Sequence, residues 1–256
     1  MHGFAVFLGK ELTEILRTWR LYVVPGILLF FGLTSPIIAE ITPSLLSNMA
    51  SSDVQGIVIE IPPATTVDAY LQWSNNAMQI ALFALIITVA GAVSGERRSG
   101  TAQLVLTKPV SRSAMVIAKM VSNWLLVLVT GVISAALCIG VTAFMFDTSL
   151  VPEFLALVAL WYLLACFLVA LSVTLSVLLK SQAGAAGAGL AVYFAMSVLS
   201  LWVVMRDYSP VGLLGLGDRI LTGGEDLSVF WPVAATLMSV VILIMLACWA
   251  FDRQEL

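Results

Sequence analysis

The sequence predicts an all-α, polytopic membrane protein with six transmembrane helices. Hydrophobic residues make up 61% of the 256 positions, charged residues only 11%, and the mean hydropathy is +1.05. A soluble domain is nearer half apolar and a quarter charged. Because six long apolar runs take up most of the chain, we expect a single transmembrane domain over residues 1–256 without a separate soluble catalytic domain.

Each apolar run is long enough to cross a bilayer. Asp, Glu, Lys, Arg and His are absent from the interiors of the runs. At about 1.5 Å per helical residue, each run reaches roughly 25 to 40 Å, against a hydrocarbon core of about 30 Å. The six predicted spans are residues 21–41, 77–94, 122–145, 153–179, 185–204 and 230–249.

An amphipathic helix is predicted ahead of the first span, over residues 3–20. Lys10, Glu14 and Arg17 share its polar side, and we expect the helix to lie on the membrane surface. An amphipathic start to the first span, with no role of its own, is the alternative. The apolar side consists of Phe4, Phe7, Leu8, Leu12, Ile15, Leu16 and Trp19.

The distribution of Lys and Arg predicts the orientation, because these residues accumulate on the cytoplasmic side. With the N-terminus inside, ten of the twelve Lys and Arg residues lie inside, and only Arg206 and Arg219 lie outside. Most acidic residues fall on the outer segments. We therefore expect a multi-pass protein of the inner (cytoplasmic) membrane, with both termini cytoplasmic.

Two predicted extracellular segments, 42–76 and 205–229, are longer than turns require. The first contains three prolines and the apolar stretch 57–61, so we expect an ordered cap. The second contains Pro210 and five glycines within 208–226. It can dip partway into the membrane or form a plain interfacial loop.

The segment between the second and third spans, residues 95–112, is the densest basic patch on the expected cytoplasmic side. Arg97, Arg98, Lys108 and Arg112 can be topogenic charges and nothing more. The order of the other residues nevertheless indicates a further role for this segment.

A short helix is predicted inside this segment. Thr101 can start it, the apolar residues 104–106 give it an apolar tip, and Pro109 ends it by forcing Lys108 out of helical geometry. Ser111 can then cap the next helix. An apolar tip ringed by Arg and Lys suits a cleft on another protein, because apolar anchors supply affinity and charges set the register.

The segment resembles the signature between the second and third spans of type-2 ABC exporter permeases. That family typically shows an acidic residue, a GlyThr pair, an apolar triplet and ProValSerArg, as residues 96–112 do here. The N-terminal helix, with LysGluLeu at 10–12 and Arg17, also resembles that of the family. The likeness therefore covers essentially the whole chain, with a departure at 102–103, where many members carry Leu and an acidic residue.

The resemblance implies that this chain is the permease subunit of an ATP-driven exporter. Its segment 96–112 would be the coupling helix that docks onto a separate ABC ATPase subunit. The residues implied in this coupling are Glu96, Arg97, Arg98, Gly100, Thr101, Leu104, Val105, Leu106, Pro109, Ser111 and Arg112.

The chain carries only an incomplete phosphate-binding pattern. Gly95 and Gly100 have the GxxxxG spacing of a phosphate-binding loop, but Thr101 stands where a lysine should follow. No strand is predicted before it. We therefore expect no catalytic residue, cofactor or metal in this chain, and the resemblance implies that the partner subunit binds ATP and Mg²⁺.

A run of small residues, 183–189, opens the fifth predicted span. Gly184 with Ala188, and Gly187 with Ala191, form small-xxx-small pairs that let helices approach closely. The resemblance implies a second permease subunit, identical or different, and these residues are a predicted contact with it. Packing within one subunit is the alternative.

Other function classes find less support. His2 is the sole histidine, so neither a zinc motif nor a Ser-His dyad is present in the membrane. Cys138, Cys166 and Cys248 lie in apolar runs and are expected to be buried hydrophobes. The net charge of −3 and the lack of a basic stripe outside the membrane-flanking segments argue against a nucleic-acid partner.

Two alternatives stay open. An accessory permease, for maturation of or signalling to another membrane or periplasmic system, shares the same signature. An ion-coupled secondary transporter would usually place ionisable residues at midplane depth. Spans rich in Trp, Phe and Met suit a hydrophobic or amphipathic cargo, although such residues also fill ordinary membrane helices.

Overall fold

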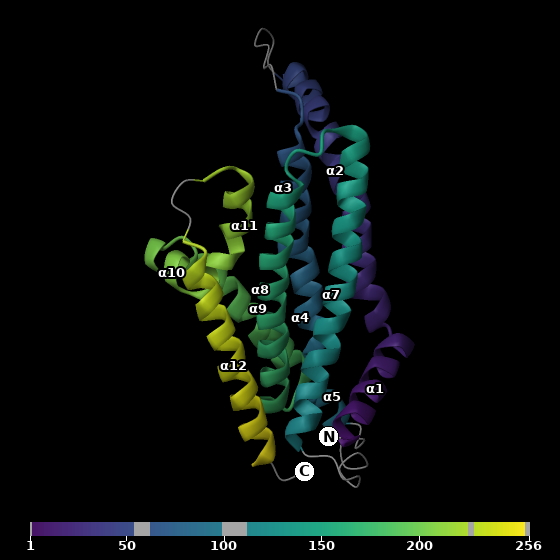
Figure 1. Cartoon of the computed structure of the whole chain (residues 1–256), viewed down its shortest axis with the longest axis vertical. Helices are drawn as coiled ribbons and strands as arrows, with labels where there is room; N and C mark the ends of the chain where they lie inside the picture. Colours follow the sequence, from purple (N-terminus) through teal and green to yellow (C-terminus); the bar gives the residue numbers. More distant parts are fainter. Residues whose placement is uncertain (1, 54–61, 99–111, 225–227, 254–256) are drawn as a thin grey trace.

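The computed structural model describes residues 2–53, 62–98, 112–224 and 228–253, which form an elongated helical bundle (Figure 1). No strand occurs within these ranges. Two short elements are a π-helical turn, η1, and a 3-10 turn, η2. The elements in chain order are α1 (His2–Arg17), α2 (Arg20–Asp53), α3 (Thr66–Asn76), η1 (Ala77–Ala81), α4 (Leu82–Val89), α5 (Ser94–Arg98), α7 (Arg112–Met145), α8 (Val151–Leu178), α9 (Gln182–Leu199), α10 (Val203–Tyr208), η2 (Pro210–Gly212), α11 (Leu213–Leu221) and α12 (Phe230–Asp252).

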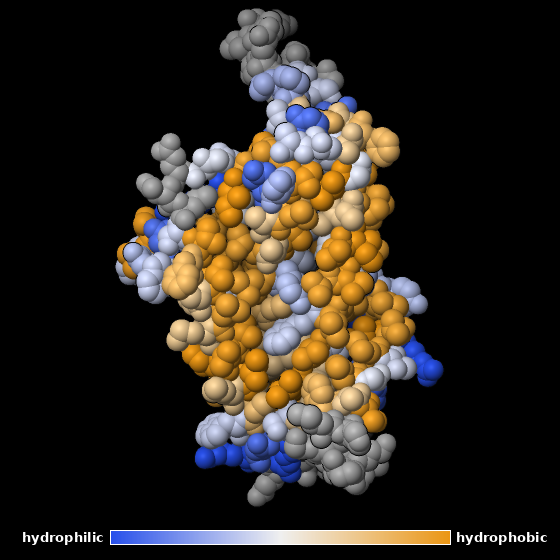
Figure 2. All heavy atoms as spheres, viewed as in Figure 1, coloured by the Kyte–Doolittle hydropathy of each residue, from blue (hydrophilic) through white to orange (hydrophobic). Residues whose placement is uncertain are grey.

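Six helical stretches of the described chain are long and apolar enough to cross a membrane, which confirms the predicted all-α polytopic class. Figure 2 shows the consequence on one face of the molecule, where the middle is mainly hydrophobic and hydrophilic residues gather toward both ends. The six stretches are Arg20–Ser47, Thr66–Glu96, Arg112–Met145, Val151–Leu178, Gln182–Leu199 and Phe230–Asp252.

The two ends of the bundle differ in what they carry. Both termini, α1, α5 and the last turn of α12 lie at one end, which we call the N/C end (Figure 1). The other end, which we call the distal end, carries the outer part of α2 together with α10 and α11. The amphipathic α1 packs against α7 at the N/C end, with Phe7, Glu11 and Ile15 buried.

The first spanning helix is longer than predicted. Helix α2 continues past residue 41 to Asp53, through the start of the predicted segment 42–76. Along this extension, the hydroxyls of Thr42, Ser44 and Ser47 donate to backbone carbonyls three or four residues earlier, within the helix. Polar residues of this kind can therefore stay in a helix. The predicted apolar stretch 57–61 lies outside the described residues.

The second span is the most deeply buried of the six, and it begins at Thr66, earlier than the predicted residue 77. Its first turn is held by Asp68, whose Oδ2 accepts hydrogen bonds from the backbone N–H and the hydroxyl of Thr65 at 2.8 and 2.7 Å. This reciprocal arrangement is typical of a helix N-terminus. The span then continues through the π-helical turn η1 and α4, is interrupted by a turn at residues 90–93, and resumes in α5.

An aromatic cluster joins the second span to α8. Tyr70 stacks on Phe154 with ring centroids 4.1 Å apart, and Trp73 meets Trp161 edge to face at 5.7 Å. The Trp73 indole also donates to the Ser134 hydroxyl at 2.9 Å, which in turn donates to a backbone carbonyl of α2. These two bonds satisfy the Trp73 indole, the Ser134 hydroxyl and the Leu28 carbonyl inside the apolar core.

The predicted segment 205–229 folds largely into helices. After α9 ends at Leu199, α10 and η2 lead into α11, which packs lengthwise against α8 (Figure 1). Asp218 on α11 accepts a hydrogen bond from the Ser74 hydroxyl at 2.6 Å, and burial raises the pKa of this carboxyl. Helix α11 is therefore fixed to both α8 and the second span.

The contact between α11 and α8 predicts a sharp difference between two glycines of α11. A Cβ on Gly217 would lie 2.7 Å from Leu157 Cγ and 3.2 Å from Leu157 Cα, whereas a Cβ on Gly215 would meet nothing within 4 Å. Gly217→Ala should lower the thermal unfolding midpoint in detergent, by an overpacking cost of about 1–3 kcal/mol. Gly215→Ala should leave it equal or higher. Equal effects of the two changes would contradict this packing.

Candidate functional site

The predicted coupling segment begins at the N/C end, directly where the second span finishes. Among the residues predicted for coupling, Glu96 and Arg112 are those whose side chains the structure describes. Arg97 and Arg98 belong to the short helix α5. Residues 99–111, with Gly100, Thr101, Leu104, Val105, Leu106, Pro109 and Ser111, lie outside the described residues.

A break in the second span redirects the chain just before this segment. Residues 90–93 form a turn between α4 and α5. The Ser176 hydroxyl of α8 accepts hydrogen bonds from the backbone N–H groups of Val93 and Ser94, both at 3.0 Å. It also donates to Ser94 Oγ at 3.2 Å. Since a helix break inside the bundle frees backbone groups, this serine lets the span end at a defined angle.

A buried ion-pair network links α5 to α1 and α7. The Lys119 ammonium, on a side chain only 1% exposed, lies 2.7 Å from Glu96 Oε1 and 3.0 and 3.1 Å from the two oxygens of Glu11. Lys10 adds contacts of 3.0 Å to the same Glu96 oxygen and of 3.0 Å to Glu11. It also lies 2.6 Å from Glu14.

Each charge in this network depends on the others. Taking an ammonium out of water costs several kcal/mol, so Lys119 requires its two carboxylate partners. Burial disfavours the charged form of Lys10, but its hydrogen bond to Glu14 and the charges of Glu11 and Glu96 outweigh this and raise its pKa. Burial similarly opposes ionisation of Glu14, but hydrogen bonding to Lys10 lowers its pKa.

Three carboxylates of this network are close enough together to resemble a metal site, because all three contact the ammonium of Lys10. Oxygens of Glu11, Glu14 and Glu96 all lie within 4.8 Å of one another. Lys10 Nζ is within 3.0 Å of an oxygen of each of them. The position that a metal would take is therefore filled by an ammonium, and we assign the cluster to ion pairing.

The far end of the predicted segment is fixed to a different helix. Arg112 Nη1 donates to the backbone carbonyls of Phe251 and Asp252 at 3.5 and 3.3 Å. These carbonyls belong to the last turn of α12, where helix geometry leaves acceptors unpaired and the helix dipole favours a cation. The two ends of the segment are thus tied to α1, α7 and α12.

The ion-pair network contains four residues that were not predicted as part of the site: Lys10, Glu11, Glu14 and Lys119. The two buried ones, Glu11 and Lys119, carried a signal in the sequence. Lys119 is the only charged residue between Ser113 and Met145, and Glu11 falls at helical spacing between Phe7 and Ile15 on the apolar side of the N-terminal helix. A charge on each apolar face indicates a buried partner, because an unpaired one would be too costly.

The predicted contact with a second permease lies on α9. Gly184, Gly187 and Ala191 are exposed, and Ala188 is half-buried, on a helix whose other side packs inward through Ala185 and Gly189. Within the described chain, no atom approaches within 4 Å of a Cβ placed on Gly187. The small-residue face is therefore open on this subunit, and the dimer contact stays a prediction.

Six apolar helices, with a buried ion-pair network at one end, define a multi-pass membrane protein. The family model described as ABC-2 family transporter protein matches residues 5–208, and the chain belongs to this family. It is 25% identical, over 262 residues, to a protein of Bacillus subtilis (strain 168) named as the uncharacterized transmembrane protein YxlG. That match covers 100% of this chain and 99% of the relative. Membership makes the chain a membrane-spanning subunit of an ABC transporter.

The ion-pair network predicts a strong coupling between Lys119 and Glu11. Lys119→Met leaves Glu11 and Glu96 with Lys10 as their remaining lysine, and should lower the free energy of unfolding by about 3–5 kcal/mol. Adding Glu11→Gln should cost much less in this variant than in the wild type. A double-mutant cycle, followed by unfolding in detergent, measures this coupling. Lys180→Met, at an exposed position, is the control, and strictly additive effects would contradict the network.

Proposed function

We propose that this chain is the permease of an ATP-driven exporter and that segment 96–112 receives the power stroke of a separate ATPase subunit. The observation that carries this proposal is the anchoring of the segment at both ends. Glu96 joins it to Lys119 of α7 and, through Lys10 and Lys119, to α1, while Arg112 joins it to α12. A movement of the segment would therefore be transmitted to α1, α7 and α12 together.

The mechanism we propose is a rigid-body movement of the bundle. The partner would bind ATP and Mg²⁺ and change shape, and apolar residues of the segment, Leu104, Val105 and Leu106, would sit in its cleft. Ion pairs buried at the N/C end would prevent α1, α5 and α7 from sliding past one another. This chain would contribute no catalytic residue, because its GxxxxG pattern lacks the lysine of a phosphate-binding loop.

The depth of the charges favours an ATP-driven transporter over an ion-coupled one. Lys119 lies seven residues into the 34-residue helix α7, or about 10 Å from its start at 1.5 Å per residue. Ion-coupled transporters usually place their ionisable residues at the midplane. In the described chain, the buried lysine and its carboxylate partners instead lie beside the coupling segment.

Orientation, partner subunits and cargo belong to the same proposal. We place the N/C end in the cytoplasm of a cell whose inner membrane holds the chain, in line with ten Lys and Arg residues inside against two outside. A second permease would pack on the open face of α9. The cargo would be hydrophobic or amphipathic, since the spans are rich in Trp, Phe and Met and hold few charges.

The docking role is tested with a change at the apolar tip. Leu104→Asp should abolish both co-purification of the ATPase subunit and cargo-stimulated ATP hydrolysis, because it places a charge in an apolar contact. Leu104→Met keeps the apolar volume and should retain most of the activity. Membrane insertion, followed by fractionation, should be the same in both variants. Full activity of Leu104→Asp would refute docking through this segment.

The orientation is tested with single cysteines in a chain whose three native cysteines are replaced by alanine. Thr148 is exposed in the connection between α7 and α8 at the distal end, and Ala183 is exposed in the first turn of α9 at the N/C end. In right-side-out vesicles, a membrane-impermeant maleimide should label Thr148→Cys and not Ala183→Cys. Inverted vesicles should give the opposite pattern. The reverse result would place the N/C end outside.

A further inference from the structure

A stripe of polar side chains runs along the outer part of the second span. Asp68, Gln72, Asn75 and Gln79 recur every three or four residues, and therefore share one side of α3 and η1. Asp68, Asn75 and Gln79 are exposed, while the opposite side of the same helix buries Tyr70, Trp73 and Ala77. The polar side thus faces away from the core of this subunit.

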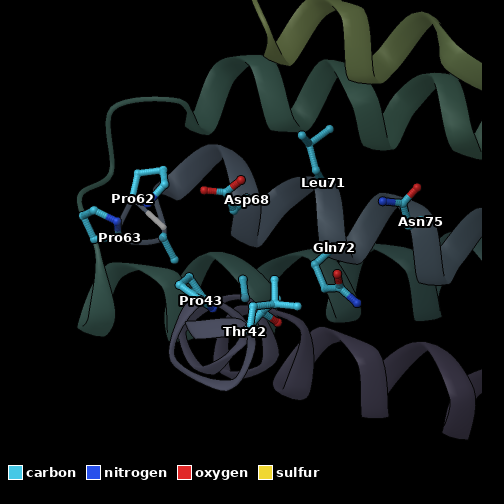
Figure 3. A pocket seen from close by; sticks show the side chains of 11 residues that line it. Thr42, Pro43, Pro62, Pro63, Asp68, Leu71, Gln72 and Asn75 are labelled. Carbon is cyan, nitrogen blue, oxygen red and sulfur yellow. The ribbon is translucent and has the colours of Figure 1, made fainter. Parts of the chain in front are cut away.

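Three residues of this stripe, Asp68, Gln72 and Asn75, line a pocket between α2 and α3 at the distal end. The pocket has a volume of about 410 Å³, within the range of small-molecule sites. Figure 3 shows Asp68, Gln72 and Asn75 projecting from one helix, with Thr42 and Pro43 of α2 across from them and Pro62 and Pro63 beside Asp68. Ala39, Leu46, Ala64 and Leu71 complete its apolar lining.

The polar groups of the pocket have capacity for a ligand. Thr65 binds Asp68 through one oxygen, Oδ2, and within the described ranges Oδ1 has no hydrogen-bond partner. The amides of Gln72 and Asn75 likewise lack a partner among the described residues. Leaving such groups against lipid tails would be costly, so a polar occupant or water must meet them.

The charge of the lining selects the occupant. Asp68 is the one ionisable residue among the eleven that line the pocket, and Lys, Arg and His are absent from them. A carboxylate with two amides suits an ammonium group and repels an anion, while Pro43, Leu46 and Leu71 suit an alkyl chain. We propose that this pocket binds an amphipathic organic cation, with its ammonium at Asp68 and its chain on the apolar wall.

The binding and the transport of such a cation are separate claims. That the ligand is also the exported cargo rests on the proposed function, whereas the pocket itself needs no ATPase subunit. Binding is therefore measured on the purified full chain in phosphatidylcholine nanodiscs, without a partner. Loss of ATPase docking in other variants would overturn the exporter and leave the cation site standing.

The experiment compares three decyl compounds that differ only in the headgroup: decyltrimethylammonium, decyl sulfate and decyl maltoside. Radiolabelled decyltrimethylammonium should bind saturably, above the level of empty nanodiscs, and the other two should compete weakly. Asp68→Asn keeps an oxygen that can accept from Thr65, and should weaken binding about tenfold, because it removes the charge attraction between the carboxylate and a quaternary ammonium that has no N–H to donate. Glu40→Gln removes an exposed carboxylate of α2 that does not line the pocket, and should leave the affinity unchanged.

A matched pair of residues on α2 tests where the alkyl chain of the ligand lies, independently of charge. Leu46 lines the pocket and its neighbour Leu45 does not. Leu46→Trp should fill the apolar wall and block binding, whereas Leu45→Trp should not. The proposal is overturned if wild-type binding does not saturate, if the sulfate or the maltoside competes as well as the cation, or if the variants at 68 and 46 bind like their controls.

Discussion

A lysine ammonium held inside the protein organises the N/C end of this molecule. Lys119 is buried, and Glu11 and Glu96 contact its ammonium from two other helices. The requirement is mutual, since those carboxylates would be equally costly if they were buried without the lysine. Electrostatics thus determines how α1, α5 and α7 meet. Apolar packing alone would allow them to shift past one another.

The second span depends on a related constraint, the need to satisfy every backbone polar group within a membrane. At the π-helical turn, the Met78 carbonyl accepts a hydrogen bond from the Tyr193 hydroxyl of α9 at 2.7 Å. At the break before α5, Ser176 of α8 bonds two freed N–H groups. A tyrosine and a serine from neighbouring helices therefore make two irregular turns tolerable in the most buried span.

The two ends of the second span contribute to two different sites. Its distal part presents Asp68, Gln72 and Asn75 to a pocket, and its other end places Glu96 in the ion-pair network. The same continuous stretch, Thr66–Glu96, thus connects the inferred ligand site with the proposed coupling segment. A span with local turns can be redirected at defined points, so a change at one end can alter the geometry at the other. In the exporter that we propose, this stretch would link ligand binding at the distal end to the ATPase subunit.

Composition and residue order determined much of this protein by themselves. Long apolar runs without internal charges require a membrane-spanning helix, because no other single segment satisfies its own backbone in lipid. The pattern from Glu96 to Arg112 was equally visible, and the family it resembles is the one to which the chain belongs. Helix limits were harder to predict, since Thr42, Ser44 and Ser47 look like the end of a span until their hydroxyls are seen to bond within the helix. Only the tertiary structure could pair Lys119 with Glu11, 108 positions apart, or bring Asp68 opposite Pro43 across a pocket. Hydropathy and helical spacing report which side of a helix is apolar, but the partner of a buried charge depends on which helices become neighbours.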